Sequence, residues 1–374
     1  MPKTALIYSR EMTCYDLGRN HPLRPERLRL VYELVSACGF IGGDSVLVPP
    51  EPATREDLET VHLPAYIDVV KALSDGDYSP ARTRSGFGSL DNPPFPGMYE
   101  ASLIYTGASV LAAELVASGE CDRAFNVSGG LHHALPDRAS GFCVFNDAAI
   151  AVERLRPRFK RIAYIDLDAH HGDGVQSIFY DTDQVLTISL HESGDYLFPG
   201  TGYPREIGVG AGKGCSVNIP FTPSTPDDVY LWAFDQIVPP LIEAYQPDAI
   251  VAQLGVDAHF DDPLAHLILT SSGFTSLVER ILSFGRPVVA LGGGGYNLLA
   301  VPRLWTLAYG LMAGRDLPDQ IPEEYARKYG TARLHDTVRP PVSRHQRHNV
   351  RPDAEEAVAA IKRLVFPLHG LSPD

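Results

Sequence analysis

Residues 161–174 read RIAYIDLDAHHGDG. The first half is a short apolar run, which is typical of a strand buried on both faces of a parallel sheet. The second half places three aspartates and two histidines within the eight positions 166–173, directly after that strand. Ligands of open α/β sheets bind outside the carboxyl ends of the strands, so the stretch predicts a functional site at that edge.

Similar apolar runs recur along the chain and alternate with amphipathic stretches. Two of these stretches, 101–119 and 146–156, predict helices, the first ending at Gly119 and the second beginning with Asn146 or Asp147 as its cap. The alternation predicts an α/β fold: a single open, mostly parallel sheet with helices on both faces. The predicted strands are TALIYS (4–9), RAFNVSGG (123–130), RIAYIDLD (161–168), QVLTISLHE (184–192), AIVAQLGVD (249–257) and PVVALGGGG (287–295).

Composition limits the classes of function. The 374 residues are 44% hydrophobic and 21% charged, which is ordinary for a globular protein. No uninterrupted apolar run reaches the roughly 18 residues of a membrane helix, and the N-terminus resembles no signal peptide. Five cysteines without a CxxC pair indicate a reducing compartment, so we expect a cytoplasmic protein. The net charge of −14 disfavours nucleic acid and anionic membranes as partners and favours basic ones, such as lysine-bearing protein segments.

Asp168 and His170 are the first candidate metal ligands. Carboxylate and neutral imidazole bind divalent metals well, and residues i and i+2 of an extended segment point to the same face. Asp257, at the end of another predicted strand, is the third candidate. Each residue alone also fits a turn or a helix cap. Together they favour a catalytic zinc site, which has three protein ligands and one open position.

Two histidines and two further aspartates predict proton chemistry beside this metal. His132 and His133 follow the predicted strand 123–130, and as neighbours they point in different directions. Asp166 lies deeper in its strand, where a buried carboxylate must be paired, so it should orient an imidazole or hold a second cation. Asp173 can orient the other imidazole or cap the helix that follows. One histidine would then act as general base and the other as electrostatic stabiliser or acid.

The glycine-rich segments are not nucleotide-binding loops. In GGGGYN (292–297) the GxGxxG spacing places Asn297 where a glycine is required, and in GAGKG the lysine Lys213 is followed by Gly214 instead of Ser or Thr. Four glycines let the backbone approach a ligand closely. Tyr296 can then offer its hydroxyl to a developing oxyanion, although it also fits a side chain packed at the sheet end.

Seven motifs occur in this order along the chain: GGLHHA, GFCVFND, DLDAHHGDG, SLHE, FPGTG, GVDAHFDDPL and GGGGYN. With them the chain resembles the zinc-dependent histone deacetylase superfamily, which has the arginase/deacetylase fold. The resemblance runs from about residue 8 to about residue 312, and HPLRPERLRL with DAHFDDPL is similar to the bacterial acetoin-utilization deacetylases. We therefore predict one deacetylase domain over 1–374, with 313–374 as a C-terminal extension packing on it.

The resemblance implies a role for each candidate residue. One catalytic Zn²⁺, or Fe²⁺ in its place, would be held by Asp168, His170 and Asp257. His132 would pair with Asp166 and His133 with Asp173, while Tyr296 would polarise the scissile carbonyl. A structural K⁺ would be bound by Asp166, Asp168, His170, Ser189 and Leu190, and a second cation near the 179–185 turn. The substrate would be held by Asp91, Gly141, Phe142, Phe198 and Leu264. Arg27 would line an acetate-exit channel, unless it is a plain surface helix residue.

The implied reaction is hydrolysis of acetyl-lysine in proteins or peptides, with three alternatives. An acetylpolyamine amidohydrolase would act on small acetylated amines, and it fits the acidic residues Asp261 and Asp262, which with His259 are otherwise expected to cap turns. A binuclear manganese ureohydrolase needs the motif DAHxD, but Gly172 replaces its last aspartate. A non-catalytic binding module would keep the fold alone. The oligomeric state is not predicted.

Overall fold

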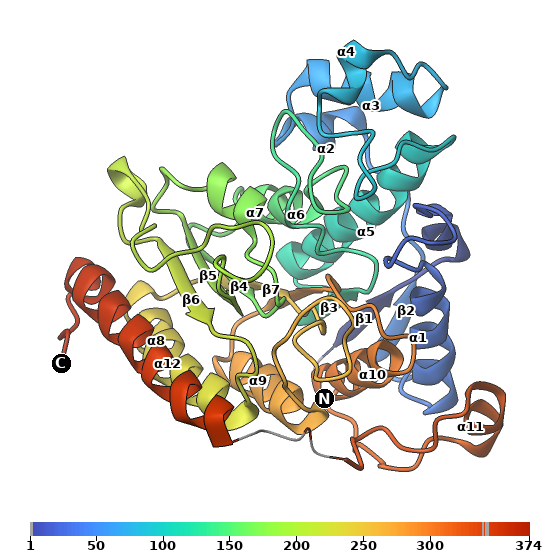
Figure 1. Ribbon diagram of the computed structural model, residues 1–374. Helices are drawn as coiled ribbons and strands as arrows, with labels where there is room; N and C mark the ends of the chain where they lie inside the picture. The colour runs from blue at the N-terminus through green and yellow to red at the C-terminus, as the bar shows by residue number, and fades with distance from the viewer. Residues whose placement is uncertain (1–2, 339, 341–343) are drawn as a thin grey trace.

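The computed structural model describes residues 3–338, 340 and 344–374. Its centre is one eight-stranded sheet with the order β2-β1-β3-β8-β7-β4-β5-β6, in which every pairing is parallel (Figure 1). This confirms the predicted fold class. The strands are β1 (Thr4–Ile7), β2 (Ser45–Val48), β3 (Arg123–Asn126), β4 (Ile162–Asp166), β5 (Val185–Glu192), β6 (Ser216–Phe221), β7 (Ala249–Gln253) and β8 (Val288–Leu291).

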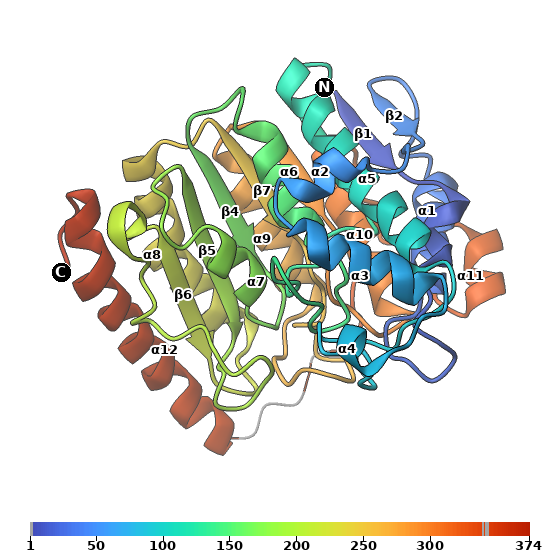
Figure 2. The same cartoon turned by 90° about the horizontal axis from the view of Figure 1, so that it is seen from above.

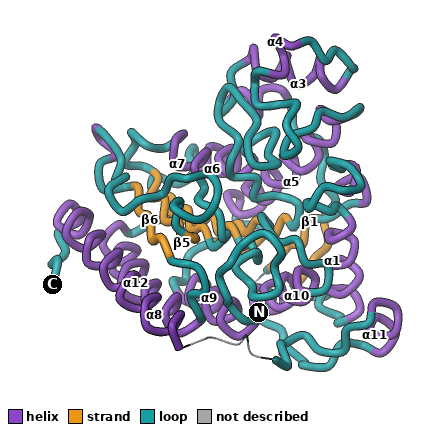
Figure 3. Tube along the Cα trace, in the orientation of Figure 1, coloured by secondary structure: helices purple, strands orange, loops and turns teal. Residues whose placement is uncertain are grey.

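Helices cover both faces of the sheet (Figure 2). One face carries α5 (Met98–Ser118), α6 (Asp147–Leu155) and α7 (Asp173–Ile178). The other carries α1 (Glu26–Ala37), α8 (Asp227–Tyr245), α9 (Ser271–Ser283) and α10 (Ala300–Met312), so the strands form the middle layer (Figure 3). Smaller helices lie outside these layers: α2 (Arg55–Glu59), α3 (Pro64–Ser74), α4 (Pro80–Thr83), α11 (Glu323–Tyr329) and the 3-10 turns η1 (Arg10–Cys14), η2 (Gly210–Gly212) and η3 (Phe366–His369).

All six predicted strands are present, and two further strands were missed. Every residue of β4 is buried, as the apolar run 162–166 predicted. The missed strands β2 and β6 are the two edges of the sheet. Val46 and Leu47 of β2 are exposed, and β6 contains Pro220, which an edge strand tolerates because no further strand needs its missing N–H.

The two predicted helix ends are confirmed. Gly119 ends α5 in the left-handed conformation at φ 78°, which a glycine adopts without steric cost. Asn146 caps α6 by accepting the N–H of Ala149. Among the described helices, α5 alone is long and apolar enough to cross a membrane by length and composition, and 61% of its most apolar stretch is buried within the protein.

The C-terminal segment packs on the sheet through its last helix, α12 (Arg344–Val365). Figure 1 shows α12 beside α8, near the β6 edge of the sheet. Its residues Val350, Val358 and Ile361 belong to the same buried cluster as the strands. The extension boundary at residue 313 stays a prediction.

Candidate active site

The sheet order places the polar clusters next to one another. The strands β3, β8, β7, β4 and β5 are consecutive neighbours in the sheet, although they come from distant parts of the chain. One of the predicted motifs lies at or directly after the carboxyl end of each of these strands. Because parallel strands end at the same edge, these motifs share one side of the molecule, as the sequence predicted.

Asp168, His170 and Asp257 converge on one point. Their ligand atoms all lie within 4.8 Å of one another. The Nδ1 atom of His170 lies 2.8 Å from Asp257 Oδ2 and 3.1 Å from Asp168 Oδ1. Both carboxylates are almost fully buried. The structure therefore brings together the three residues that the sequence predicted as metal ligands.

Gln253 fixes Asp168, and the sequence analysis missed it. Its side-chain amide donates to Asp168 Oδ2 at 2.7 Å, and the same oxygen accepts the N–H of Gly294 at 2.7 Å. Asp257 is held in turn by the N–H of Ala169 at 2.7 Å. The signal was present in the sequence, since Gln253 is the one polar residue in the apolar run AIVAQ and is completely buried.

The two histidines form separate dyads, as predicted. His132 Nδ1 lies 2.7 Å from Asp166 Oδ2, and His133 Nδ1 lies 2.7 Å from Asp173 Oδ1. Tyr164 also donates to Asp166 Oδ2. Asp173 occupies the first turn of α7, while the N-cap position belongs to Gly172, so the alternative expectation that Asp173 caps this helix is wrong.

The electrostatic environments of the two imidazoles differ. Burial disfavours the charged form of His132, but the carboxylates of Asp166 and Asp168 outweigh it and raise its pKa to about 9. Burial and the neighbouring His132 lower the pKa of His133 to about 4, although Asp173 opposes this. The two Nε2 atoms are 3.0 Å apart. With His132 as donor, the pair contains one imidazolium and one neutral imidazole near pH 7.

Tyr296 lines the same cavity as His132, His133 and Asp168. Its backbone N–H donates to Asp262 Oδ2 at 2.8 Å, so Asp262 holds the backbone of the tyrosine in place. Burial raises the pKa of the Tyr296 phenol well above its usual value, which keeps the hydroxyl protonated as a donor. Asp262 also accepts the N–H of Leu264, which confirms its predicted role in a turn.

Two of the five predicted substrate residues line this cavity, and the other three lie elsewhere on the surrounding loops. Gly141 and Phe142 line it, and the Phe198 ring stands 5.0 Å from the His133 ring at 77°. A Cβ on Gly141 would lie 2.4 Å from His133 Cδ2, so only glycine fits there. Asp91 is exposed, and its carbonyl accepts from His21, whose ring packs on Phe142. Leu264 is half-buried on the loop that carries Asp262.

Arg27 is buried beneath the tyrosine loop, so its reading as a surface helix residue is wrong. Its side chain donates to the carbonyl of Gly295 at 2.8 Å and lies over the Trp305 ring at 5.1 Å. Burial lowers the pKa of this guanidinium, while Tyr296 and Asp168 act in the opposite direction. A buried cation therefore lies next to the candidate active site.

Three of the five predicted monovalent-cation residues, Asp166, Ser189 and Leu190, lie on the neighbouring strands β4 and β5. Asp166 of β4 pairs directly with Ser189 of β5. The Ser189 hydroxyl contacts His191 Nδ1 at 2.8 Å, and the carbonyl of Leu190 accepts from Tyr230 at 2.9 Å. In the same SLHE motif (189–192), His191 lies 3.0 Å from the carbonyl of Gly202 and Glu192 accepts the N–H of His266. These two side chains hold adjacent loops instead of joining the triad.

A parallel sheet with paired imidazoles and a convergent donor triad at its carboxyl edge defines a hydrolytic active site. The family described as "Histone deacetylase domain" matches residues 21–312. The acetoin utilization protein AcuC of Bacillus subtilis (strain 168) is 40% identical over 338 residues, covering 88% of this chain and 87% of that protein. Human histone deacetylase 1 is 36% identical over 332 residues, covering 88% of this chain and 68% of that protein.

Solved structures agree with the sequence comparison. A histone deacetylase (HDAC) homologue from Aquifex aeolicus superposes with a TM-score of 0.85 at 35% identity, covering 94% of this chain and 100% of that chain. An HDAC homologue in complex with SAHA gives a TM-score of 0.85 at 34% identity, with the same coverage. The chain belongs to the histone deacetylase family, in its bacterial AcuC-like branch. It is a deacetylase-type hydrolase of amide bonds, and this family is zinc-dependent in general.

Proposed function

We propose that this enzyme hydrolyses the acetyl amide of acetyl-lysine in cytoplasmic proteins or peptides, releasing lysine and acetate. The observation that carries the proposal is the convergence of two His–Asp dyads and Tyr296 on the triad Asp168, His170 and Asp257.

The triad fits one divalent cation. Burial, and then the charge of Asp168, raise the pKa of Asp257 well above that of an ordinary carboxyl, so a cation at the triad would favour its ionised form. The neighbouring glycines leave room only for these carboxylates, since a Cβ on Gly294 would lie 2.1 Å from Asp257 Oδ2. Two carboxylates and an imidazole suit Zn²⁺, and Fe²⁺ accepts the same donors. We also propose that a structural K⁺ is bound by Asp166, Asp168, His170, Ser189 and Leu190.

Such an ion supplies Lewis-acid polarisation of the acetyl carbonyl and activation of water. The neutral His133 donates from Nδ1 to Asp173, and its Nε2 accepts the proton of the attacking water in place of the hydrogen bond from His132. The charged His132, paired with Asp166, stabilises the negative charge that develops on the carbonyl oxygen. Tyr296 donates its hydroxyl to the same oxygen. His133 then passes the proton to the leaving amine, and Arg27 lines the channel through which acetate leaves.

The cavity walls favour the neutral, acetylated side chain. Acetyl-lysine brings four methylenes, and burying them between Phe142 and Phe198 contributes on the order of 3 kcal/mol. The product carries a free ammonium, which loses hydration in an apolar passage. The substrate therefore binds better than the product, and the product leaves.

Acetylpolyamines are the second substrate class. The observation in their favour is the acidic loop beside Tyr296, where Asp261 is exposed and Asp262 accepts the tyrosine N–H. A second amine of a polyamine would be attracted to this charge. The ureohydrolase alternative is disfavoured, because a Cβ at Gly172 would lie 2.6 Å from Asp166 Oδ2 and leave no room for another ligand.

Activity of metal-reconstituted protein tests the proposal. We expect turnover of acetyl-lysine peptides, inhibition by SAHA, and one divalent ion per chain. Higher kcat/KM for acetylpolyamines than for every peptide would assign the enzyme to the second substrate class. Two divalent ions per chain with no deacetylation would overturn the proposal in favour of a ureohydrolase.

A further inference from the structure

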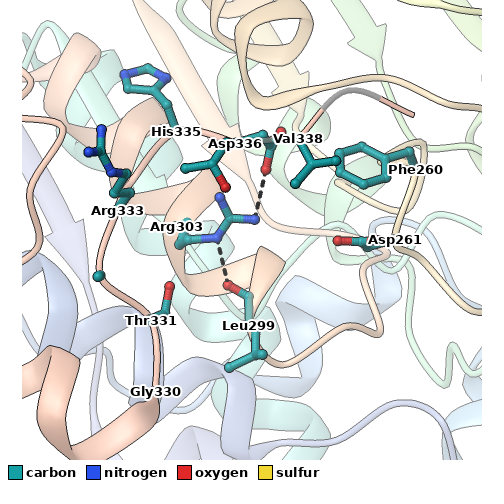
Figure 4. Close-up of a pocket in the computed structure, with 12 residues that line it drawn as sticks. Phe260, Asp261, Leu299, Arg303, Gly330, Thr331, Arg333, His335, Asp336 and Val338 are labelled. Carbon is teal, nitrogen blue, oxygen red and sulfur yellow. Dashed lines mark hydrogen bonds and ion pairs between the residues drawn. The ribbon is translucent and has the colours of Figure 1, made fainter. Parts of the chain in front are cut away.

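Asp336 connects the C-terminal segment to the loops of the active site. It follows residue 312, where the family match ends, and its side chain is 7% exposed. One carboxylate oxygen lies 2.9 Å from Arg303 Nη2, and the other lies 3.1 Å from His259 Nε2. In Figure 4 the Arg303 side chain lies between the carboxylate of Asp336 and the carbonyl of Leu299, with Phe260 and Asp261 on another wall of the same pocket.

The hydrogen bonds of His259 assign its proton. Its Nδ1 accepts the backbone N–H of Asp261 at 3.2 Å, so the ring proton is on Nε2 and is donated to Asp336. His259 is 3% exposed, and its ring centroid lies 4.4 Å from that of Phe260 with the two rings tilted by 34°. Asp336 therefore fixes the orientation in which His259 can receive the Asp261 N–H.

The turn held by His259 carries the residue that holds Tyr296. The N–H of Asp262 donates to the carbonyl of His259 at 2.9 Å, and the carboxylate of Asp262 accepts the Tyr296 N–H at 2.8 Å. Asn297 closes the same turn by donating to the carbonyl of Asp261 at 3.0 Å. A continuous set of hydrogen bonds thus runs from Asp336 to the backbone of Tyr296.

We propose that Asp336 is a positioning residue for Tyr296, acting through His259 and the turn at Asp261 and Asp262. The inference rests on the proposed function, because Tyr296 must donate to the oxyanion for its position to affect turnover. A donor displaced by about 1 Å can cost roughly a hundredfold in rate, so the backbone anchor of Tyr296 also affects turnover.

The test compares four variants with the wild-type holoenzyme. Asp336→Ala removes the anchoring carboxylate. Asp336→Asn keeps the size of the side chain and serves as the second variant if the alanine variant does not fold. His259→Asn keeps an acceptor near the Asp261 N–H but loses the bond to Asp336. Asp319→Asn is the matched control, because Asp319 bonds Arg333 and the N–H of His335, both within the same C-terminal segment.

We expect kcat to fall roughly 10- to 100-fold in the Asp336 and His259 variants, with KM and metal content little changed. The same substitutions in a Tyr296→Phe background should cause no further loss, because the group that they position is gone. Amide hydrogen exchange of the peptide 292–299 should accelerate in the Asp336 variants and not in Asp319→Asn.

Three results would overturn the inference. One is wild-type kcat in both Asp336→Asn and His259→Asn, and another is a full additional loss in the Tyr296→Phe background. In both cases wild type and Asp319→Asn still deacetylate, so the proposed function survives. The third is absence of deacetylation in wild type and Asp319→Asn, which removes the proposed function and the inference together.

Discussion

The side-chain amide of Gln253 bridges two parts of the site: it donates to Asp168 Oδ2 and its carbonyl oxygen accepts the N–H of Gly255, each at 2.7 Å. Gln253 thereby orients one triad carboxylate from inside the sheet. Residues that orient metal ligands typically contribute 10- to 100-fold in metal affinity.

Gln253→Glu should weaken zinc binding by about 10- to 100-fold, because the substitution replaces a donor by a second carboxylate facing Asp168. Zinc affinity measured by competition with a chelator checks this. The control is Gln320→Glu, which adds the same charge at an exposed position. Equal zinc affinity in both variants would show that Gln253 does not help to orient the metal ligands.

Asp168→Ala and His170→Ala should abolish both zinc binding and deacetylation, since each removes one of three convergent ligands. Elemental analysis of the purified variants gives the metal content, and a peptide assay gives the activity. Full activity of either variant after treatment with a chelator would show that the triad is not the metal site.

Tyr296→Phe should keep the zinc and lose about 10²- to 10³-fold in kcat, the usual cost of one oxyanion donor. Tyr325→Phe is the matched control, because its hydroxyl donates to the carbonyl of Leu30 away from the cavity. Near wild-type kcat in Tyr296→Phe would exclude the phenol from the reaction.

Gly141→Ala should reduce kcat more than ten-fold, because the added Cβ would displace His133 and the Phe198 ring. Gly119→Ala imposes a similar backbone strain, at φ 78°, but its Cβ meets nothing within 4 Å. Kinetics and thermal unfolding of both variants separate the two effects. If the two lose activity equally, strain alone explains the result and the contact with His133 does not.

His62 should make stability depend on pH. Its Nε2 accepts the N–H of Asn146, its Nδ1 bonds the carbonyl of Leu135, and burial lowers its pKa to about 4. The unfolded chain then binds more protons than the folded one between pH 4 and the usual histidine value of about 6.5. The contribution is complete above that value and is lost as pH falls towards 4, by about 3 kcal/mol in the free energy of unfolding.

Urea unfolding at pH 7.5 and pH 5 measures this effect. In His62→Gln the difference in the free energy of unfolding between the two pH values should shrink, while His369→Gln, which changes a half-buried histidine near the C-terminus, should keep it. An unchanged difference in His62→Gln would show that other groups cause the acid sensitivity.

Much of the site could be predicted because each motif is local. Asp168 and His170 lie two positions apart on one extended segment, and the strand that precedes them is recognisable by its unbroken apolar run. Asp257 and Tyr296 each follow another such run. The rule that parallel strands end at one edge was then enough to bring these residues together.

The remaining features depend on contacts between distant segments. The hydrogen bond between Asp336 and His259 joins residues 77 positions apart, and no periodicity or spacing in the sequence predicts it. Gln253 was visible as a buried polar residue, but its partner was not. The edge strands escaped prediction because exposed Val46 and Leu47 and the proline in β6 weaken the pattern of a buried strand.

The position of β7 and β8 in the sheet has a consequence for biosynthesis. These two strands occupy the centre, between β3 and β4, yet they are the last strands in the chain. During translation the groups β2-β1-β3 and β4-β5-β6 cannot be joined until residues 249–291 have left the ribosome. The triad and both dyads therefore assemble only near the end of synthesis, and a truncated nascent chain has no hydrolytic centre to expose.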